Sequence, residues 1–385
     1  MRTRSLSLTS LAFGAAALCG IQVSAQAAES WDEVPGLNVT LLMGVDFIDA
    51  SVGYVAGGTS DSAAIWGSFD GGNTWVRQTK NSQTAGYFDV SVGSEGHALA
   101  GGMGINRILA GSSFTTDGVT WRPSQDRWTF ATWQDVDAIN GQDMVMIGWW
   151  FAPRDTGYGI AMSHDGGMSY EYFPWPYETA TRYGSFLTPE RGYVTGGEWP
   201  DDDSSRIMGN GDHAINQWMA VAGENPERAD ANYPGYQGVI AKTEDGGETW
   251  ELLFQDFDRF YFNGIHFLDE MNGWAVAEGD EGAWIFHTAD GGETWEEQHF
   301  EPSGSLMQIH MINDRVGWAG GAMIEGAGFS TLLLKTTDGG RTWTKYNMRD
   351  RYYIFNLDFY DENRGWAVAY GAADGLCSVL SYTAN

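Results

Sequence analysis

Seven repeated segments of this chain place a polar residue at one equivalent position, immediately before an apolar residue. The aligned residues are four carboxylates, one hydroxyl and two imidazoles: Asp46, Asp89, Asp137, Ser185, His266, His310 and Asp358. A ring of such side chains could hold a cation, because His and carboxylate ligands suit Zn²⁺ or Mn²⁺. The alternative is structural, since polar groups inside a protein mostly hydrogen-bond to neighbouring backbone. We favour the structural role and expect neither a metal nor a cofactor.

Catalytic motifs are missing from the rest of the sequence. It contains no serine or cysteine triad context, no phosphate-binding loop, no His-rich metal motif and no "FRIP"-like stretch of the kind that introduces a sialidase arginine triad. A glycoside hydrolase needs only two carboxylates about 5–10 Å apart, and 51 Asp and Glu residues produce such pairs by chance. We expect no catalytic residue and no enzyme, with a glycoside hydrolase as the alternative.

A second phrase, "TADGGETW" at 288–295, recurs along the chain. Its aspartates lie 45–48 residues apart, with one longer step of 80: Asp70, Asp117, Asp165, Asp245, Asp290 and Asp338. The Asp can accept hydrogen bonds from its own turn, the glycines can adopt positive φ and the Trp can pack over the turn. One carboxylate per turn falls short of the roughly six to eight oxygens that Ca²⁺ prefers. These Asp-boxes are therefore predicted to be structural.

The elements that position both sets of residues are short strands. An apolar residue stands six positions before a Gly-aromatic pair, as in "FLDEMNGWAVA" from Phe267, and an Asp-box turn follows. Periods of about 40–50 residues with short strands are typical of propeller blades. The seventh unit ends before its fourth strand, which "SWDEV" at 30–34 can supply. We predict an all-β, seven-bladed β-propeller at 28–385, closed by pairing of its N- and C-terminal strands, with an insertion at 198–238 in blade four.

The combined repeat, F-x₅-G-W-A-V followed by T-x-D-G-G-x-T-W, resembles the photosystem II assembly and stability factors of the Ycf48 and HCF136 type. The resemblance implies a seven-bladed, non-enzymatic assembly factor that binds a membrane-protein precursor on the lumenal or periplasmic side. Those factors are linked with an Arg-rich patch, whereas this chain has only scattered arginines such as Arg182. We therefore expect a Ycf48-like protein with a divergent partner. Because sialidases and xyloglucan hydrolases share the Asp-box, a glycan-binding or glycan-cleaving protein is the alternative.

Charge and the N-terminus restrict the partners and the compartment. The formal net charge of −30 disfavours nucleic acid as a partner. Residues 1–27 combine two arginines, an apolar run and a small-residue "AQA" end, which is the pattern of a cleaved signal peptide. We expect a periplasmic or secreted monomer that binds a protein partner, a membrane-protein complex, and that binds neither nucleic acid nor anionic lipid. A glycan is the alternative ligand.

Loops of units three and four contain most of the irregular sequence. Aromatic residues are enriched in binding hot spots, and a polar rim around an apolar centre is typical of interfaces. We predict the binding surface on the face that carries the loops between second and third strands, and an insertion that folds over these loops would instead bury the aromatics. The predicted residues are Trp149, Trp150, Phe151, Arg154, Tyr158, Trp175, Tyr177, Trp199, Asp201, Asp202, Asp203 and Trp218.

Overall fold

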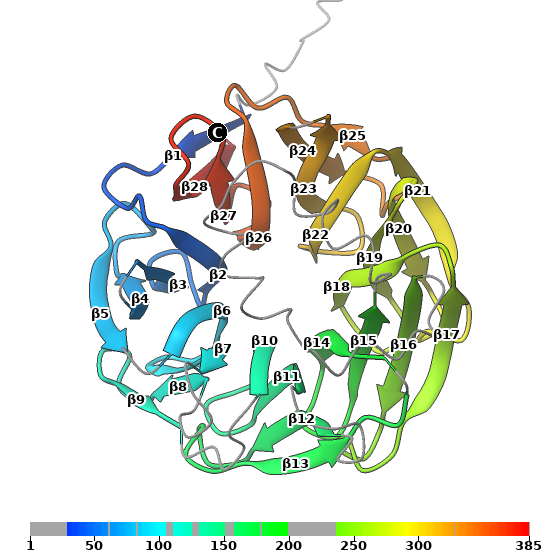
Figure 1. The fold of residues 1–385 in the computed structure, drawn as a ribbon, viewed down its shortest axis with the longest axis horizontal. Helices are drawn as coiled ribbons and strands as arrows, with labels where there is room; N and C mark the ends of the chain where they lie inside the picture. The colour runs from blue at the N-terminus through cyan, green and yellow to red at the C-terminus, as the bar shows by residue number, and fades with distance from the viewer. Residues whose placement is uncertain are drawn as a thin grey trace, which may run out of the picture.

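The computed structural model describes residues 29–60, 62–81, 84–104, 111–124, 131–150, 158–177, 179–198, 236–326 and 328–384. Within these ranges every regular element is a β-strand, and the strands form seven blades of four around one axis (Figure 1). The described residues accordingly offer no helix that is long and apolar enough to cross a membrane. The all-β, seven-bladed prediction is confirmed.

Each blade runs outward from the axis in chain order, and we call its strands a, b, c and d. The innermost a strands are β2 (Leu41–Phe47), β6 (Thr84–Ser94), β10 (Ala131–Ala138), β14 (Thr181–Phe186), β18 (Tyr261–Phe267), β22 (Gly304–Met311) and β26 (Tyr352–Asp361). The b strands are β3 (Gly53–Thr59), β7 (His97–Gly104), β11 (Met144–Trp150), β15 (Gly192–Glu198), β19 (Gly273–Gly279), β23 (Gly317–Glu325) and β27 (Arg364–Gly371).

The c strands are β4 (Ser62–Ser68), β8 (Ser112–Thr115), β12 (Tyr158–Ser163), β16 (Gln237–Thr243), β20 (Gly282–Thr288), β24 (Gly328–Thr336) and β28 (Cys377–Ala384). The outermost d strands are β5 (Val76–Asn81), β9 (Trp121–Pro123), β13 (Glu171–Pro174), β17 (Glu251–Phe257), β21 (Glu296–Pro302), β25 (Thr344–Lys345) and, for blade 7, β1 (Glu29–Glu33). The chain therefore completes its last blade with its first strand.

The terminal strands pair as the sequence predicts. β1 runs antiparallel to β28, with Glu29 opposite Ala384 and Glu33 opposite Leu380. The Trp31 ring packs edge-on against Phe359, with ring centroids 5.8 Å apart, and Lys335 of blade 6 contacts the Glu29 carboxylate at 2.7 Å. Because β1 covers the outer edge of β28, blade 7 has no missing strand and the ring closes.

A Gly at or next to the start of the b strand in blades 1, 4, 5, 6 and 7 explains the Gly-aromatic repeat. A Cβ added to Gly365 would lie 2.3 Å from the ring of Phe359, the last apolar residue of the facing a strand, and Gly53 has the same relation to Phe47. A large ring can therefore lie across the b strand only where that strand has no side chain. Blade 2 differs, because its smaller Val92 leaves room for the side chain of Ala98, and in blade 3 Ala138 faces Met144.

The aromatic residue after this Gly joins neighbouring blades. Trp366 of blade 7 stacks on Phe47 of blade 1, with ring centroids 3.4 Å apart and planes at 4°. Tyr193 of blade 4 stacks in the same way on Phe267 of blade 5, at 3.5 Å and 5°. The repeat thus encodes contacts between blades as well as within them, which explains why its spacing is kept around the ring.

Candidate functional site

The Asp-box of blade 5 shows what each box carboxylate contacts. Asp290 Oδ1 accepts hydrogen bonds from the Thr288 hydroxyl at 2.8 Å and the Thr294 N–H at 2.9 Å, and Oδ2 accepts one from the Thr294 hydroxyl at 2.6 Å. Thr288 Oγ1 accepts the Gly292 N–H at 2.8 Å, and Gly292 has a φ of 94°. The Asp290 carboxylate is therefore occupied by its own turn.

The other boxes repeat this arrangement. Each carboxylate accepts a backbone N–H from its own turn, and these carboxylates are Asp70, Asp117, Asp165, Asp245 and Asp338. Hydrogen bonds from Thr294 lower the pKa of Asp290, as the equivalent bonds do at the other five boxes. In addition, the Gly291 N–H donates to the Met271 carbonyl in the a–b turn, so each box is tied to the same end of the blade.

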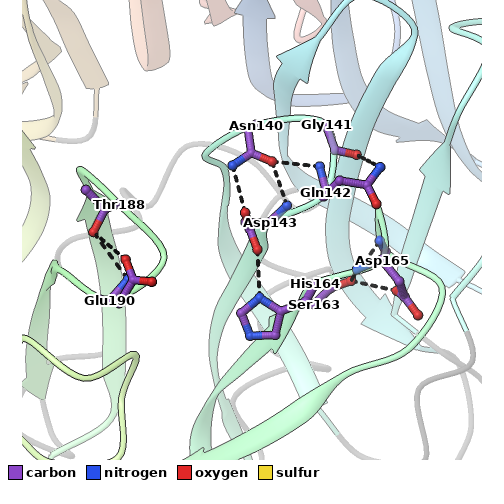
Figure 2. A network of polar contacts seen from close by, with 10 residues as sticks. Asn140, Gly141, Gln142, Asp143, Ser163, His164, Asp165, Thr188 and Glu190 are labelled. Carbon is purple, nitrogen blue, oxygen red and sulfur yellow. Dashed lines mark hydrogen bonds and ion pairs between the residues drawn. The ribbon is translucent and has the colours of Figure 1, made fainter.

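Blade 3 adds an imidazole to this face (Figure 2). His164, beside the box residue Asp165, lies with Nδ1 2.7 Å from Asp143 Oδ1 in the neighbouring a–b turn, and Asn140 donates to Asp143 Oδ2 at 2.8 Å. Burial alone would raise the pKa of Asp143, but the bonds from Asn140 and His164 lower it. This polar network joins two turns of one blade and leaves its carboxylate ionised.

The predicted ring lies at the axis, and most of its members accept a backbone hydrogen bond from the next blade. Asp358 Oδ2 accepts the Phe47 N–H at 2.9 Å, Asp46 Oδ2 accepts the Val92 N–H at 2.6 Å and Asp137 Oδ2 accepts the Phe186 N–H at 2.6 Å. Ser185 Oγ accepts the Phe267 N–H at 3.0 Å in the same way. Each acceptor is the polar residue immediately before the repeated apolar residue of one a strand, and each donor belongs to the next a strand.

One predicted member of the ring is wrong. The position equivalent to Asp46 in blade 2 is Ser91, which accepts the Ala138 N–H at 3.1 Å, and Asp89 lies two residues earlier on β6. The six-residue spacing counted from Val90 predicts Gly96 as the repeat Gly, whereas Gly96 lies in the a–b turn with a φ of 81° and Ala98 occupies the repeat position. The small Val92 permits Ala98, so the expected Gly is not needed there.

Burial sets the protonation of the axial groups. It raises the pKa of Asp46 and of Asp137 to about 6, and it lowers the pKa of His266 to about 4. His266 and His310 lie side by side with ring centroids 4.8 Å apart, and His310 Nδ1 is 3.5 Å from Asp358 Oδ1. Across the described part of the chain, no group of three or more His, Cys, Asp or Glu residues is arranged to hold a metal ion.

A buried polar network that the sequence did not reveal lies at the opposite ends of the inner strands. Glu278 accepts hydrogen bonds from the Tyr261 and Ser305 hydroxyls, and Ser305 also contacts the Tyr353 hydroxyl at 2.7 Å. The Arg182 guanidinium lies over the Tyr261 ring at 4.8 Å. Burial raises the pKa of Glu278, although its hydrogen bonds and Arg182 oppose that shift. These residues come from four blades, so their proximity is not visible in the local sequence.

The structure places the predicted aromatic residues in different surroundings. Trp175 is buried at 6% exposure in the core between blades 3 and 4, where its Nε1 donates to Thr179 at 3.2 Å and its ring meets Trp250. Tyr177 is half-buried beside it and donates to the Trp250 carbonyl at 3.4 Å. Their rings pack the scaffold beneath the predicted surface and present little area to a ligand.

Of the other predicted binding residues, three lie in β-strands and the rest lie outside the described ranges. Trp149 and Trp150 were expected in a loop but form the end of β11, paired with Thr132 and Ala131, and Tyr158 begins β12. The residues outside the described ranges are Phe151, Arg154, Trp199, Asp201, Asp202, Asp203 and Trp218.

Comparisons with known proteins agree with this architecture. No family model and no curated protein matches the sequence. A solved structure of Ycf48 bound to a D1 peptide is similar, with a TM-score of 0.59 and 16% identity over 93% of this chain and 97% of that chain. Ycf48 from Cyanidioschyzon merolae gives a TM-score of 0.57 and 15% identity over 92% of this chain and 98% of that chain.

Enzymes share the fold at a lower score. The GH74 enzyme of Niastella koreensis gives a TM-score of 0.52 and 14% identity, over 88% of this chain and 51% of that chain. The blades, their box turns and the hydrogen bonds between blades at the axis define this protein as an Asp-box β-propeller. Its fold is Ycf48-like over nearly its whole length, which confirms the resemblance seen in the repeat.

Proposed function

We propose that this protein is a non-enzymatic propeller that binds a segment of a protein partner and serves as an assembly or accessory factor for a membrane complex. The observation that carries the proposal is the similarity to Ycf48, which extends over 93% of this chain and 97% of the Ycf48 chain. That solved structure is of Ycf48 bound to a D1 peptide. We extend peptide binding, but not the identity of the peptide, to this chain.

The state of the carboxylates supports a binding protein over a hydrolase. A glycoside hydrolase needs one carboxylic acid and one carboxylate that can reach the substrate. The described box carboxylates are hydrogen-bonded within their turns, and Asp46, Asp137 and Asp358 each accept a backbone N–H of the next blade. Carboxylates that accept these backbone hydrogen bonds cannot transfer a proton to or from a substrate without losing the bonds that join the blades.

Charge complementarity sets the chemistry of the proposed partner. With 51 acidic and 21 basic residues, the chain repels anionic segments, attracts basic ones and is compatible with neutral ones. The signal-peptide pattern at 1–27 supports a periplasmic or secreted location, where the protein would act as a monomer on the exposed segments of a membrane protein.

The proposed binding face is the b–c end of blades 3 and 4. β11 ends at Trp150 and β12 begins at Tyr158, so the segment between them emerges at this end of blade 3. In blade 4, Glu198 pairs with Gln237, which anchors both ends of the insertion at the corresponding end of the adjacent blade. The described residues that flank 151–157 and 199–235 thus lie on neighbouring blades at one face.

The test starts with capture from detergent-solubilised membranes, chemical cross-linking and identification of the cross-linked segment. A synthetic peptide of that segment is then titrated calorimetrically beside xyloglucan oligosaccharides. We expect saturable binding of the peptide, weakened about tenfold, or about 1.4 kcal/mol, by Trp150→Ala or Trp199→Ala. Phe69→Ala is the matched control, because Phe69 is 50% exposed on the box face of blade 1.

Two results would reject the proposal. Binding or cleavage of the oligosaccharides without peptide binding would favour the glycan alternative, which the GH74 similarity supports. Peptide binding that Phe69→Ala weakens and Trp150→Ala leaves unchanged would place the partner on the box face instead.

A further inference from the structure

Two aspartates at the axis face each other across the junction of blades 2 and 3. Asp89 on β6 and Asp135 on β10 are only 7% and 6% exposed, and Asp89 Oδ2 accepts the N–H of Val136, the residue after Asp135, at 3.1 Å. Two carboxylates cannot form a hydrogen bond without a proton, because an ionised carboxylate is only an acceptor. Two carboxyl groups buried at the same junction can therefore hydrogen-bond to each other only while one of them holds a proton.

Each carboxyl also accepts hydrogen bonds from other blades. Asp89 Oδ2 accepts the Val136 N–H at 3.1 Å, and Asp89 Oδ1 accepts the Asn356 amide of blade 7 at 3.0 Å. Asp135 Oδ2 accepts the Gly184 N–H of blade 4 at 2.7 Å. The pair therefore connects blades 2, 3, 4 and 7 through one buried cluster.

Blade 1 leaves room for the contact between blades 7 and 2. Its residue in this layer is Gly44, and a Cβ added there would lie 2.6 Å from the Asp89 Cα. With no side chain in between, Asn356 reaches past blade 1 to Asp89. Blades 2 and 3 are also the pair whose sheets join, through a bridge between Met103 of β7 and Thr132 of β10.

We propose that Asp89 and Asp135 share one proton and act as a pH-sensitive clasp that holds the junction of blades 2 and 3 closed while the proton is present. Loss of the proton leaves two buried anions in contact, whose repulsion opens the junction. The clasp is a property of the scaffold and does not depend on which partner the propeller binds.

Among the described residues, the other charged groups that act on the pair are carboxylates, which oppose a second negative charge. Asp46 on β2 acts on Asp89, Asp137 on β10 acts on Asp135, and both interactions raise the pKa values. On β14, the Tyr183 hydroxyl interacts with both aspartates, and Arg182 acts on Tyr183. On the remaining packed strands, the residues opposite the pair are not titratable: Gly101 of β7, Ile147 of β11 and Asn356 of β26, with Asp358 two residues beyond.

The pH dependence follows from these surroundings. Burial raises the pKa of Asp89 to about 7, and burial together with Asp89 raises the pKa of Asp135 well above its usual range. An unfolded Asp titrates near ~3.9, so the folded protein binds more protons above that pH. The stabilisation is therefore fully present below pH ~4 and is lost as the pH rises through about 7.

The decisive experiment is an NMR titration of protein labelled with ¹³C at the Asp side-chain carboxyl. Asp135→Asn keeps the shape and gives Asp89 an amide donor, so we expect the Asp89 midpoint to fall by about 1 pH unit or more. Asp137→Asn is the matched control, because Asp137 lies two residues along β10 and accepts a backbone N–H without contacting Asp89. It should leave the Asp89 midpoint within about 0.3 units.

A second measurement reads the junction itself. Hydrogen-exchange protection of the Val136 amide, corrected for intrinsic rates, should fall about tenfold between pH 6 and pH 9 in the wild type and stay constant in Asp135→Asn. An Asp89 midpoint unchanged by Asp135→Asn would show that burial alone holds the proton, and constant Val136 protection in the wild type would show that no clasp opens. Should Asp135→Asn fail to fold, Asp89→Asn with Asp135 as the reporter decides the same question.

Discussion

The junction of blades 1 and 2 offers a quantitative test of how box turns lock neighbouring blades. The Gly118 carbonyl of the blade 2 box is buried and accepts two hydrogen bonds from blade 1, from the Tyr54 hydroxyl at 2.9 Å and from Gln78 Nε2 at 2.9 Å. Gln78 Oε1 in turn accepts the Trp121 Nε1–H at 2.6 Å. One carbonyl thus has two donors, so removing one donor leaves it paired and removing both does not.

The expected energies follow from that redundancy. Tyr54→Phe keeps the ring and loses one hydrogen bond, which should lower the free energy of unfolding by about 1 kcal/mol. Gln78→Leu also leaves the Trp121 Nε1–H without its acceptor and should lower the free energy of unfolding by about 1–3 kcal/mol. The double variant leaves the Gly118 carbonyl buried without a blade 1 donor, so its cost should exceed the sum of the single costs by about 1 kcal/mol.

Urea denaturation followed by tryptophan fluorescence and far-UV circular dichroism measures these values, provided that the m-values of the variants agree. Tyr193→Phe is the control, since the Tyr193 hydroxyl donates at 3.3 Å to the carbonyl of Glu270, a solvent-exposed turn residue. Its cost should stay within about 0.5 kcal/mol. Strict additivity in the double variant, or an equal loss in Tyr193→Phe, would refute the redundancy argument.

Other perturbations test the remaining contacts. Asp290→Ala should lower the melting temperature and leave partner affinity unchanged, because its carboxylate bonds only to its turn; an unchanged melting temperature with lost binding would indicate a ligand loop. Gly365→Ala should cost about 1–3 kcal/mol by overpacking the Phe359 ring, and adding Phe359→Val should cost less than the sum of the two changes in urea denaturation. Burial lowers the pKa of His266 to about 4, so the free energy of unfolding should fall as the pH drops from 6.5 towards 4. Thermal scans of His266→Asn should therefore show a smaller decrease in melting temperature over this pH range. Replacing residues 200–234 by a short Gly-Ser linker should preserve the far-UV spectrum and abolish partner binding; full affinity in calorimetry would remove the insertion from the binding site.

The axial layer shows why part of the site could be predicted. Asp137 and Asp358 were correctly aligned because the apolar residue after each of them and the b strand opposite repeat with fixed spacing. Blade 2 broke the pattern, since its Val92 and Ala98 replace the large residue and the Gly of blades 1, 4, 5, 6 and 7. The sequence of either strand alone does not show that the smaller Val92 leaves room for the larger Ala98 on the facing strand.

Burial of the aromatic residues was equally hidden. Trp175 and Tyr177 lie in an irregular stretch between strands, a composition typical of surface loops, yet Trp250 of the next blade packs against Trp175. A side chain that is contacted from a neighbouring blade is buried by a residue far away in the sequence. Such burial depends on how blades sit beside each other and has no local periodicity.

The sequence by itself determined the fold class, the seven blades, the closing strand and the box turns, because each depends on residues within a few positions of one another or on a repeated spacing. Only the tertiary structure decided which acids share the axis. Asp89 meets Asp135 and Asn356 because inner strands of blades 2, 3 and 7 converge there and Gly44 leaves a space between them. Asp135 lies 46 positions from Asp89 and comes near it when blades 2 and 3 pack together, whereas Asn356 lies 267 positions away and reaches Asp89 only when the ring has closed.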